Sequence, residues 1–399
     1  MRLALVIDDY LPHSTRVGAK MFHDLACYYV SQGIEVTVIT PLESQKKALI
    51  VSELDGVTVW SFSSGAIKDV NKVRRALNES VLSLRAWRAI SPRVCSQTFD
   101  GVIYYSPSIF FGGLVSRIKS RCNCKAFLVL RDLFPQWVVD AGMIKKGSLI
   151  ERYFRYFEEY SYSQADSIGL MSANNKSLFD TLTNERYSTC ILRNWAALTP
   201  HTISDGYVSL RKKLGLDNKV IFFYGGNIGR AQDMENLLRL VKSMKKYEKA
   251  HFLFIGQGDE VDLIQSLANQ WQLDNFTYLP SVNQVEFRNI MSEADVGLFS
   301  LAYNHTAHNF PGKLLGYMVQ SMPILGSVNP GNDLLELVND NCAGLISING
   351  DDEQLFENAR FFLESDCQRS KYGKNGAILL EREFSVEKIA SRALEHLVD

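Results

Sequence analysis

The sequence contains no apolar run close to the roughly 20 residues that cross a bilayer, so no membrane-spanning helix is expected. Its seven cysteines are odd in number and scattered, which argues against a disulfide framework and favours free thiols. Cys122 and Cys124 lack a second pair at metal-ligand spacing, so no metal site is predicted. The net charge is only −1 and no recognition motif for nucleic acid is present, so nucleic acid is not expected as a partner.

A secretion signal is also missing from the pattern, because Met1–Asp8 leads directly into an apolar strand. We therefore expect a cytoplasmic protein. The 399 residues, with a hydrophobic fraction of 46%, suit two α/β domains that each bury a core. Residues 61–160 hold 16 Lys and Arg against 8 Asp and Glu, while the remaining chain holds 27 against 36. This surplus indicates either an anionic surface or ligand near that segment, or simply a solvated helical face.

Strand and helix patterns alternate along the chain in two series. The first opens with an apolar strand at 2–8, an amphipathic helix and a β-branched strand at 35–40, which together predict a right-handed βαβ unit. A polar segment at 193–206 breaks the periodicity and is a candidate linker. Buried-strand patterns then recur at 220–226, 251–256, 276–280, 296–301 and 323–327.

These patterns predict an α/β protein of two doubly wound domains, 1–195 and 196–384. The amphipathic segment 385–399 is expected to form a C-terminal helix that packs back on the first domain. Because open α/β sheets bind ligands at the carboxyl ends of their strands, we expect a ligand in a cleft between the two domains.

The strongest local motif is VIFFYGGNIGRAQDMENLL (220–238), a buried strand followed by a glycine-rich turn and a helix. The glycines at 225, 226 and 229 would let the backbone approach a diphosphate. Hydrogen-bond donors for its oxygens would come from Asn227, Arg230 and Gln232. The alternative interpretation is a tight turn that carries a surface arginine.

The next strand ends in GQGDEV, which has only two of the three glycines of a dinucleotide fingerprint, so NAD is not predicted. Asp259 and Glu260 in this segment are expected to favour the start of the helix that follows them.

A third strand-to-helix junction lies at YNHTAHNFPGKLLGYMV (303–319). Pro311 and Gly312 would open a helix whose free N–H groups, with the ammonium of Lys313, suit a phosphate. Lys313 could neutralise the negative charge of a diphosphate, including charge that builds on it as a leaving group. His305 and His308 could assist, or they are loop histidines without ligand contact.

Together with FLVLRDLFPQWVVDAG (127–142), these segments resemble family 4 glycosyltransferases of the GT-B fold over nearly the whole chain. The subgroup that the sequence resembles acts in bacterial O-antigen and capsule assembly, like the L-fucosamine transferases. The resemblance implies two Rossmann-like domains, the first on the acceptor side and the second binding the nucleotide sugar. It also implies retaining transfer of a hexose or acetamido sugar, without metal or cofactor, from a UDP-type donor to a lipid-linked or oligosaccharide acceptor.

By position, the resemblance places Asn227 and Gln232 where many members have the arginine and lysine that bind diphosphate. Leu279 and Pro280 stand near the wall of the nucleobase site. Two further positions match the first domain: Gly18 matches a glycine beside the donor phosphates, and Asp132 follows Arg131, which replaces an active-site histidine.

The family's paired glutamates are absent, because their positions hold His308 and Gly316. One of them would accept hydrogen bonds from the ribose, and Glu336 lies downstream of it. The loss leaves two rivals to a transferase: a catalytically impaired GT-B scaffold or binding subunit, and a GT-B nucleotide-sugar epimerase. The epimerase is disfavoured because the sequence lacks the paired acidic residues expected for proton transfer.

Two basic, partly apolar segments, 70–94 and 144–157, could lie on an anionic membrane surface or could be ordinary amphipathic helices packed on the sheet. The lipid-linked acceptor implied by the resemblance favours peripheral contact with the inner face of the plasma membrane.

Overall fold

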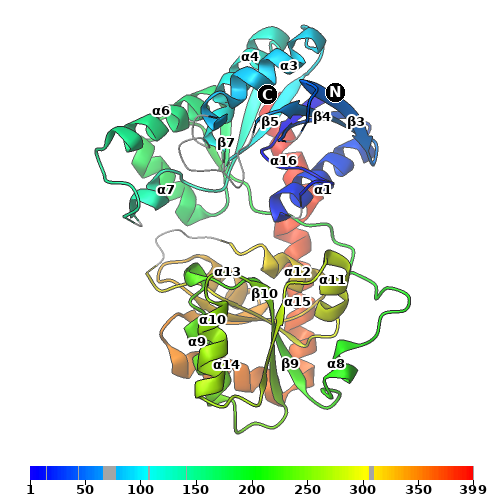
Figure 1. Ribbon diagram of the computed structural model, residues 1–399, viewed down its shortest axis with the longest axis vertical. Coiled ribbons are helices and arrows are strands. Elements are labelled where there is room, and N and C mark those ends of the chain that lie inside the picture. The colour runs from blue at the N-terminus through cyan, green and yellow to red at the C-terminus, as the bar shows by residue number, and fades with distance from the viewer. Residues whose placement is uncertain are drawn as a thin grey trace. The chain divides into compact units, whose positions relative to one another are not determined.

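The computed structural model describes residues 1–14, 16–43, 45–65, 78–106, 108–140, 142–304 and 310–398. Its contacts divide the chain into two compact units (Figure 1): unit 1 is Met1–Trp195 with Val386–Asp399, and unit 2 is Ala196–Ser385. The chain thus passes between the units twice. Each unit has a doubly wound, predominantly parallel sheet, which confirms the predicted fold class. Within the described residues, no helix is both long and apolar enough to traverse a bilayer.

Unit 1 contains an eight-stranded sheet in the order β3-β4-β2-β1-β5-β6-β7-β8. Its strands are β1 (Arg2–Val6), β2 (Glu35–Leu42), β3 (Leu49–Leu54), β4 (Val57–Ser63), β5 (Gly101–Ser106), β6 (Lys125–Leu130), β7 (Ser167–Leu170) and β8 (Thr189–Ile191). β3 pairs antiparallel with β4, whereas the other pairs are parallel. The sequence patterns missed β3 because it is an edge strand, exposed along most of its length.

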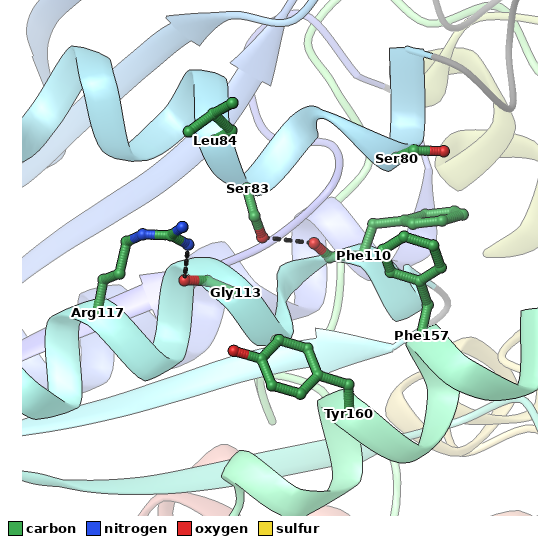
Figure 2. Close-up of a pocket in the computed structure, with 9 residues that line it drawn as sticks. Ser80, Ser83, Leu84, Phe110, Gly113, Arg117, Phe157 and Tyr160 are labelled. Atoms are coloured by element: carbon green, nitrogen blue, oxygen red, sulfur yellow. Dashed lines mark hydrogen bonds between the residues drawn. The ribbon is translucent and has the colours of Figure 1, made fainter.

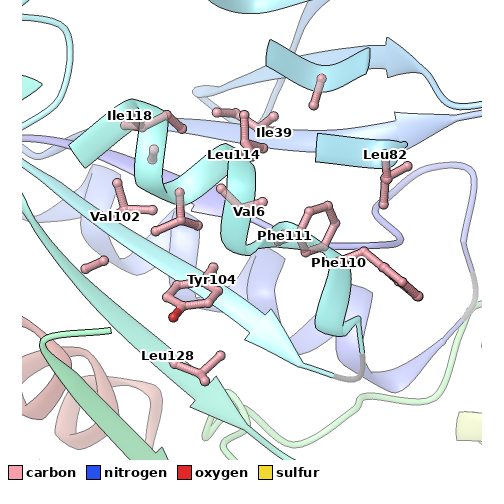
Figure 3. Close-up of a cluster of buried hydrophobic side chains, with 14 of the residues drawn as sticks. Val6, Ile39, Leu82, Val102, Tyr104, Phe110, Phe111, Leu114, Ile118 and Leu128 are labelled. Carbon is pink, nitrogen blue, oxygen red and sulfur yellow. The ribbon is translucent and has the colours of Figure 1, made fainter. Parts of the chain in front are cut away.

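The helices of unit 1 cover both faces of this sheet. They are α1 (Val17–Ser31), α3 (Leu82–Ile90), η1 (Ser91–Arg93), η2 (Ile109–Phe111), α4 (Gly112–Cys122), α5 (Gln136–Asp140), α6 (Leu149–Gln164), α7 (Ala173–Thr183) and α16 (Val386–Val398). On one face, Leu114 of α4 and Phe111 pack on Val102 and Tyr104 of β5 (Figure 3).

On the other face of the unit 1 sheet, α16 lies beside α1. The buried Tyr29 hydroxyl of α1 donates a hydrogen bond to the Ala390 carbonyl at 3.0 Å. His396 stacks on Phe127 of β6, with ring centroids 5.5 Å apart. The C-terminal helix is therefore part of the core of unit 1, although the whole of unit 2 separates it from the rest of that unit in the chain.

Unit 2 contains a six-stranded, all-parallel sheet in the order β11-β10-β9-β12-β13-β14. Its strands are β9 (Val220–Asn227), β10 (Ala250–Gln257), β11 (Phe276–Pro280), β12 (Val296–Ser300), β13 (Ile324–Val328) and β14 (Gly344–Ile348). Its helices are α8 (Leu210–Lys213), η3 (Arg230–Gln232), α9 (Met234–Ser243), α10 (Val261–Gln270), α11 (Gln284–Met291), α12 (Lys313–Val319), α13 (Leu334–Asp340), α14 (Asp352–Glu364) and α15 (Asp366–Phe384).

The strand order of unit 2 reverses between β9 and β12, since the chain builds outward from β9 to β11 and then resumes on the other side. Such a reversal separates the loops that follow the two neighbouring strands and leaves a crevice at their carboxyl ends. The loops after β9 and β12 are therefore the natural place to look for a ligand site in this unit.

Candidate functional site

The side chain of Lys313, the first residue of α12, lies at this strand reversal. Its Nζ is 3.5 Å from the centroid of the Tyr224 ring, on β9. The Nζ is buried, and no group among the described residues accepts a hydrogen bond from it. Desolvation lowers the pKa of Lys313 to about 7, and attraction to the face of the Tyr224 ring partly offsets that cost. A buried ammonium without a hydrogen-bond acceptor is a site that an anion would complete.

The backbone of Gly226 lies beside this ammonium. A Cβ atom at residue 226 would stand 3.8 Å from Lys313 Nζ, and Gly226 has φ of +121°, which L side chains rarely adopt. Its neighbour Gly225 could not carry a side chain either, because a Cβ there would lie 2.5 Å from the Phe287 ring. The glycines therefore leave bare backbone next to the buried charge, as a close-approaching diphosphate would require.

The predicted donors after Gly226 lie in one exposed turn. Asn227 Nδ2 donates to Gln232 Oε1 at 2.8 Å, so these two amides orient each other. The Arg230 side chain is 86% exposed, and its Nε lies 3.6 Å from Asp259 Oδ2. An ion pair this exposed contributes little stability, so Arg230 can leave it for a ligand at small cost.

The glycines after β10 support this turn rather than a second phosphate site. A Cβ at Gly256 would lie 1.8 Å from the Gly226 carbonyl oxygen, and one at Gly258 would lie 2.0 Å from that of Ile228. Only glycine permits such close packing of the two loops.

Glu260 and Asp259, which directly precede α10, also make contacts that the sequence did not predict. The Glu260 carboxylate accepts from the Met234 N–H at 3.3 Å, so it caps the first turn of α9 instead of its own helix α10. Asp259 pairs with Arg230 instead. The reason is that the loop after β10 runs against the start of α9, with the Glu260 N–H donating to the Ile228 carbonyl at 3.1 Å.

A buried polar network that the sequence analysis did not identify holds the floor of the site. Asn236 Nδ2 donates to Ser300 Oγ at 3.1 Å and to Ser327 Oγ at 2.6 Å. Asn349 donates to Asp233 at 3.0 Å, and the Asp233 carboxylate in turn accepts from the Asn236 N–H. This network joins α9 to the ends of β12 and β13 and holds the turn in a fixed shape. The available signal was a serine at the end of each strand pattern, the last residue of β12 and the last but one of β13.

The residues expected near the nucleobase lie at the same edge of the sheet. Pro280 ends β11 and is exposed, in register with Gly256 of β10. Leu279 packs partly buried against the core of unit 2. Tyr278 Oη donates to the Gly256 carbonyl at 3.1 Å, which fixes the end of β11 to the glycine loop.

The start of α12 provides fewer positive groups than predicted, because the helix is short. Pro311 and Gly312 precede the helix, but α12 has only seven residues, so the lysine and not the helix terminus is the main positive group here. His305 and His308 lie outside the described residues. At Gly316 a Cβ would meet Met291 Sδ at 3.5 Å, an ordinary contact, so the missing carboxylate is not excluded by crowding around the backbone.

The two predicted residues of unit 1, Gly18 and Asp132, follow its strands β1 and β6. A Cβ at Gly18 would lie 3.1 Å from the Tyr105 hydroxyl, so glycine also serves packing at this position. The Asp132 side chain reaches the solvent, but the surrounding protein partly desolvates its carboxyl and raises its pKa. The nearby charge of Arg131 lowers that pKa, but by less. A carboxyl with a raised pKa is common at functional sites.

Arg131, which replaces the family's histidine, is buried and joins the end of β6 to the segment 193–195 at the end of unit 1's first part. Its Nη2 donates to the Arg193 carbonyl at 3.0 Å, and its guanidinium lies 5.6 Å from the Trp195 ring. Desolvation lowers the pKa of Arg131 to about 10. The residue therefore has a clear structural role within unit 1.

A pocket of about 160 Å³ opens between α3, α4 and α6 (Figure 2). Leu84, Phe157 and Tyr160 contribute apolar walls, and Arg117 and Ser83 contribute polar groups. Ser83 Oγ donates to the Phe110 carbonyl at 2.5 Å, and Arg117 donates to the Gly113 carbonyl at 2.6 Å, so both are held in place.

The two basic segments flank this pocket, and they differ. In α3 the apolar side chains of Leu82, Ala86 and Ile90 are buried in the core, so there the sheet-packing interpretation holds; residues 70–77 lie outside the described residues. In α6, Leu149 and Ile150 are 82% and 59% exposed, and three tyrosines on the same helix are exposed as well, at 153, 156 and 160.

Comparison with known proteins finds a protein family whose model matches part of this chain. Residues 209–378 match the model for glycosyl transferases group 1. A relative named as a glycosyltransferase, WbjE of Pseudomonas aeruginosa, is 28% identical over 224 residues, or 55% of each chain, so the match spans about half of that protein. WcaI of Escherichia coli, named for colanic acid biosynthesis, is 24% identical over 302 residues, which cover 70% of this chain and 72% of that one.

Among solved structures, the UDP-forming α,α-trehalose-phosphate synthase of Burkholderia xenovorans superposes with a TM-score of 0.74 at 12% identity, over 99% of both chains. At this identity the likeness shows the fold alone, and it confirms the GT-B fold class.

Proposed function

We propose that this chain moves a sugar from a nucleotide-diphosphate donor to a polysaccharide precursor. The match of residues 209–378, in unit 2, to the glycosyl transferases of group 1 supports this function. The observation that carries this proposal is the buried ammonium of Lys313 beside the bare backbone of Gly226. The diphosphate of the donor would supply acceptor oxygens, which Lys313 does not find among the residues that the structure describes. The exposed guanidinium of Arg230 and the paired amides of Asn227 and Gln232 would bind its outer oxygens.

In this proposal the chemistry rests on stabilising the leaving group. As the bond from the sugar to the diphosphate breaks, negative charge grows on the diphosphate, and a fixed, desolvated cation stabilises it most at that moment. Lys313 would therefore contribute more to the transition state than to the bound donor. The resemblance favours retention at the anomeric carbon, with Asp132 on the acceptor side and Gly18 beside the donor phosphates, and His308 as a further candidate.

UDP is the proposed nucleotide, with the base against Leu279 and Pro280. The support is the resemblance and the UDP-forming activity named for the trehalose-phosphate synthase of like fold. The ribose contact would have to come from another group, because Gly316 stands where the family has a carboxylate and Glu336 is exposed on α13.

A lipid-linked or oligosaccharide acceptor of a bacterial surface polysaccharide is proposed from the O-antigen and capsule subgroup, and the names of WbjE and WcaI agree with such a role. The exposed Leu149 and Ile150, with Lys145, Lys146 and Arg152 exposed nearby, suit contact with an anionic membrane face. We therefore assign the membrane contact to α6 rather than to α3, whose apolar residues are used in the core.

The test is calorimetry with UDP and UDP-sugars, followed by donor hydrolysis and transfer assays, on the wild type and on Lys313→Met. The matched control is Lys245→Ala, an exposed lysine just beyond the end of α9. Saturable binding and turnover that Lys313→Met removes and Lys245→Ala leaves unchanged support the proposal. Binding without any turnover would favour the scaffold, and product formed without an acceptor would favour the epimerase.

A further inference from the structure

Three potential metal ligands meet in unit 1 where the turn between β3 and β4 approaches α1. His23 and Cys27 lie on α1 and Asp55 on the turn between β3 and β4, with all three ligand atoms within 4.8 Å of one another. Over the described ranges of the chain, this is the one group of three or more His, Cys, Asp or Glu side chains that meets that criterion.

Local structure places each ligand. His23 and Cys27 are four residues apart on α1, so their side chains share one face of the helix. Asp55 and Gly56 form the two-residue turn of the β3–β4 hairpin, since Leu54 pairs with Val57 and both turn residues have positive φ, of 51° and 79°.

The hairpin turn is packed against α1. A Cβ at Gly56 would lie 3.2 Å from a methyl carbon of Val30, so the turn approaches the helix closely. This packing brings Asp55 Oδ2 to 2.9 Å from His23 Nε2.

The ligand spacings suit a tetrahedral zinc ion. With Zn–S near 2.3 Å and Zn–N and Zn–O near 2.0 Å, tetrahedral angles place S and N about 3.6 Å apart and N and O about 3.3 Å apart. Cys27 Sγ lies 3.5 Å from His23 Nε2, and the Asp55 oxygen is at 2.9 Å from that nitrogen. An outward movement of Asp55 by a few tenths of an ångström would bring the N–O distance to the tetrahedral value, and the Asp55 side chain is 67% exposed.

The histidine is also held from behind. Tyr10 Oη and His23 Nδ1 share a hydrogen bond of 2.9 Å, and the Tyr10 ring packs edge-on against the imidazole at 5.7 Å between centroids. Metal-bound histidines almost always engage their second nitrogen in this way, which fixes the ring and directs the other nitrogen at the metal. Asp55 and Asp24, which pairs with Lys20 one turn earlier on α1, add negative charge near the site.

We propose that His23 Nε2, Cys27 Sγ and Asp55 Oδ2 bind one Zn²⁺ ion, with a water molecule as the fourth ligand. Bound zinc would tie the β3–β4 hairpin to α1 and so stabilise the exposed edge of the unit 1 sheet. None of the three ligands is among the residues proposed for sugar transfer, although Gly18 lies on the same helix, α1.

The experiment uses the full chain, reduced and stripped with a chelator, and titrates it with Zn²⁺ by calorimetry and with Co²⁺ by absorption spectroscopy. We expect one saturable equivalent, a thiolate-to-cobalt charge-transfer band with the visible bands of tetrahedral cobalt, and a rise in melting temperature with zinc. Cys27→Ser should remove the charge-transfer band and weaken zinc binding by about 100-fold or more. Tyr10→Phe should weaken it by roughly tenfold, as loss of outer-shell support does.

Matched controls come from the other cysteines. Cys95 and Cys367 are exposed free thiols outside the cluster, so Cys95→Ser and Cys367→Ser should bind zinc as the wild type does. Asp55→Asn changes only an exposed side chain, keeps the hairpin, and should weaken zinc binding by about tenfold or more. Circular dichroism of each variant without metal checks that it folds. Absence of saturable zinc binding to the folded wild type, or equal affinity in Cys27→Ser, overturns the proposal.

Discussion

Replacing Lys313 by methionine gives the sharpest test of the donor site, because it keeps the length of the side chain and removes one buried charge. In the unliganded protein the pKa of Lys313 is about 7, so about half of the molecules carry the charge at pH 7 and about 3% at pH 8.5. A diphosphate that contacts the ammonium would hold the proton in place. Binding of UDP is then coupled to proton uptake.

The size of the effect follows from linkage. If the complex keeps Lys313 protonated throughout, the Kd for UDP should rise roughly 15-fold between pH 7 and pH 8.5, which equals about 1.6 kcal/mol. In the protein without UDP, rising pH has the opposite effect and increases the contribution of Lys313 to the stability of the fold. The folded state binds fewer protons than the unfolded chain between pH 7 and 10.5, so the contribution of Lys313 makes the free protein more stable as pH rises, by about 1.6 kcal/mol between pH 7 and pH 8.5.

The assay is calorimetry of UDP binding at both pH values, in buffers of different ionisation enthalpy, which report proton uptake directly. Urea unfolding of the free protein at the same pH values measures the stability term. Lys313→Met should bind UDP weakly at both pH values and lose the pH dependence, whereas Lys245→Ala should behave like the wild type. A wild-type Kd that is flat from pH 7 to 8.5, with no proton uptake, would refute the assignment of Lys313 to the diphosphate.

Three further predictions concern the loops, the acceptor side and the membrane. Gly256→Ala should lower the free energy of unfolding in urea by about 1–3 kcal/mol and weaken UDP binding, because the added Cβ would lie 1.8 Å from a carbonyl oxygen. The control, Gly316→Ala, should leave the free energy of unfolding unchanged or raise it slightly. Equal losses of stability in both variants would contradict the packing argument. Asp132→Asn should slow sugar transfer by roughly 100-fold without changing the Kd for UDP. It should also remove one limb of the pH–rate profile, which lies above the usual carboxyl range because desolvation raises the pKa of Asp132. An unchanged pH–rate profile would exclude a role for Asp132 in the transfer step. Ile150→Asp should reduce cosedimentation with anionic vesicles, and Val285→Asp, at an exposed apolar residue of unit 2, should not; loss in both variants would indicate a nonspecific effect.

Much of the fold follows from the sequence, because the buried parallel strands are continuous apolar runs. VIFFYGG and HFLFIG, for example, are β9 and β10 almost to the residue. The edge strand β3 was missed because it has almost no buried residues, so it leaves no periodic signal. Its pairing with β4 becomes visible only in the register across the Asp55–Gly56 turn.

The site was predictable in part. The glycines and Arg230 stand in one segment, and Lys313 in another, that the strand–turn–helix pattern marks as ligand loops. Other roles depend on contacts between loops that are distant in sequence. The capping of α9 by Glu260 and the link from Asn349 to Asp233 are of this kind, and spacing along the chain does not encode them.

The double passage of the chain between the units has a consequence for synthesis on the ribosome. Unit 2 is complete once Ser385 has been made, whereas unit 1, although it starts at the N-terminus, still lacks α16. Until that helix leaves the exit tunnel, the apolar surfaces of α1 and β6 that it covers, including Tyr29 and Phe127, have no partner from it. The domain translated second can therefore finish folding first, and the nascent first domain is the one that needs protection from aggregation.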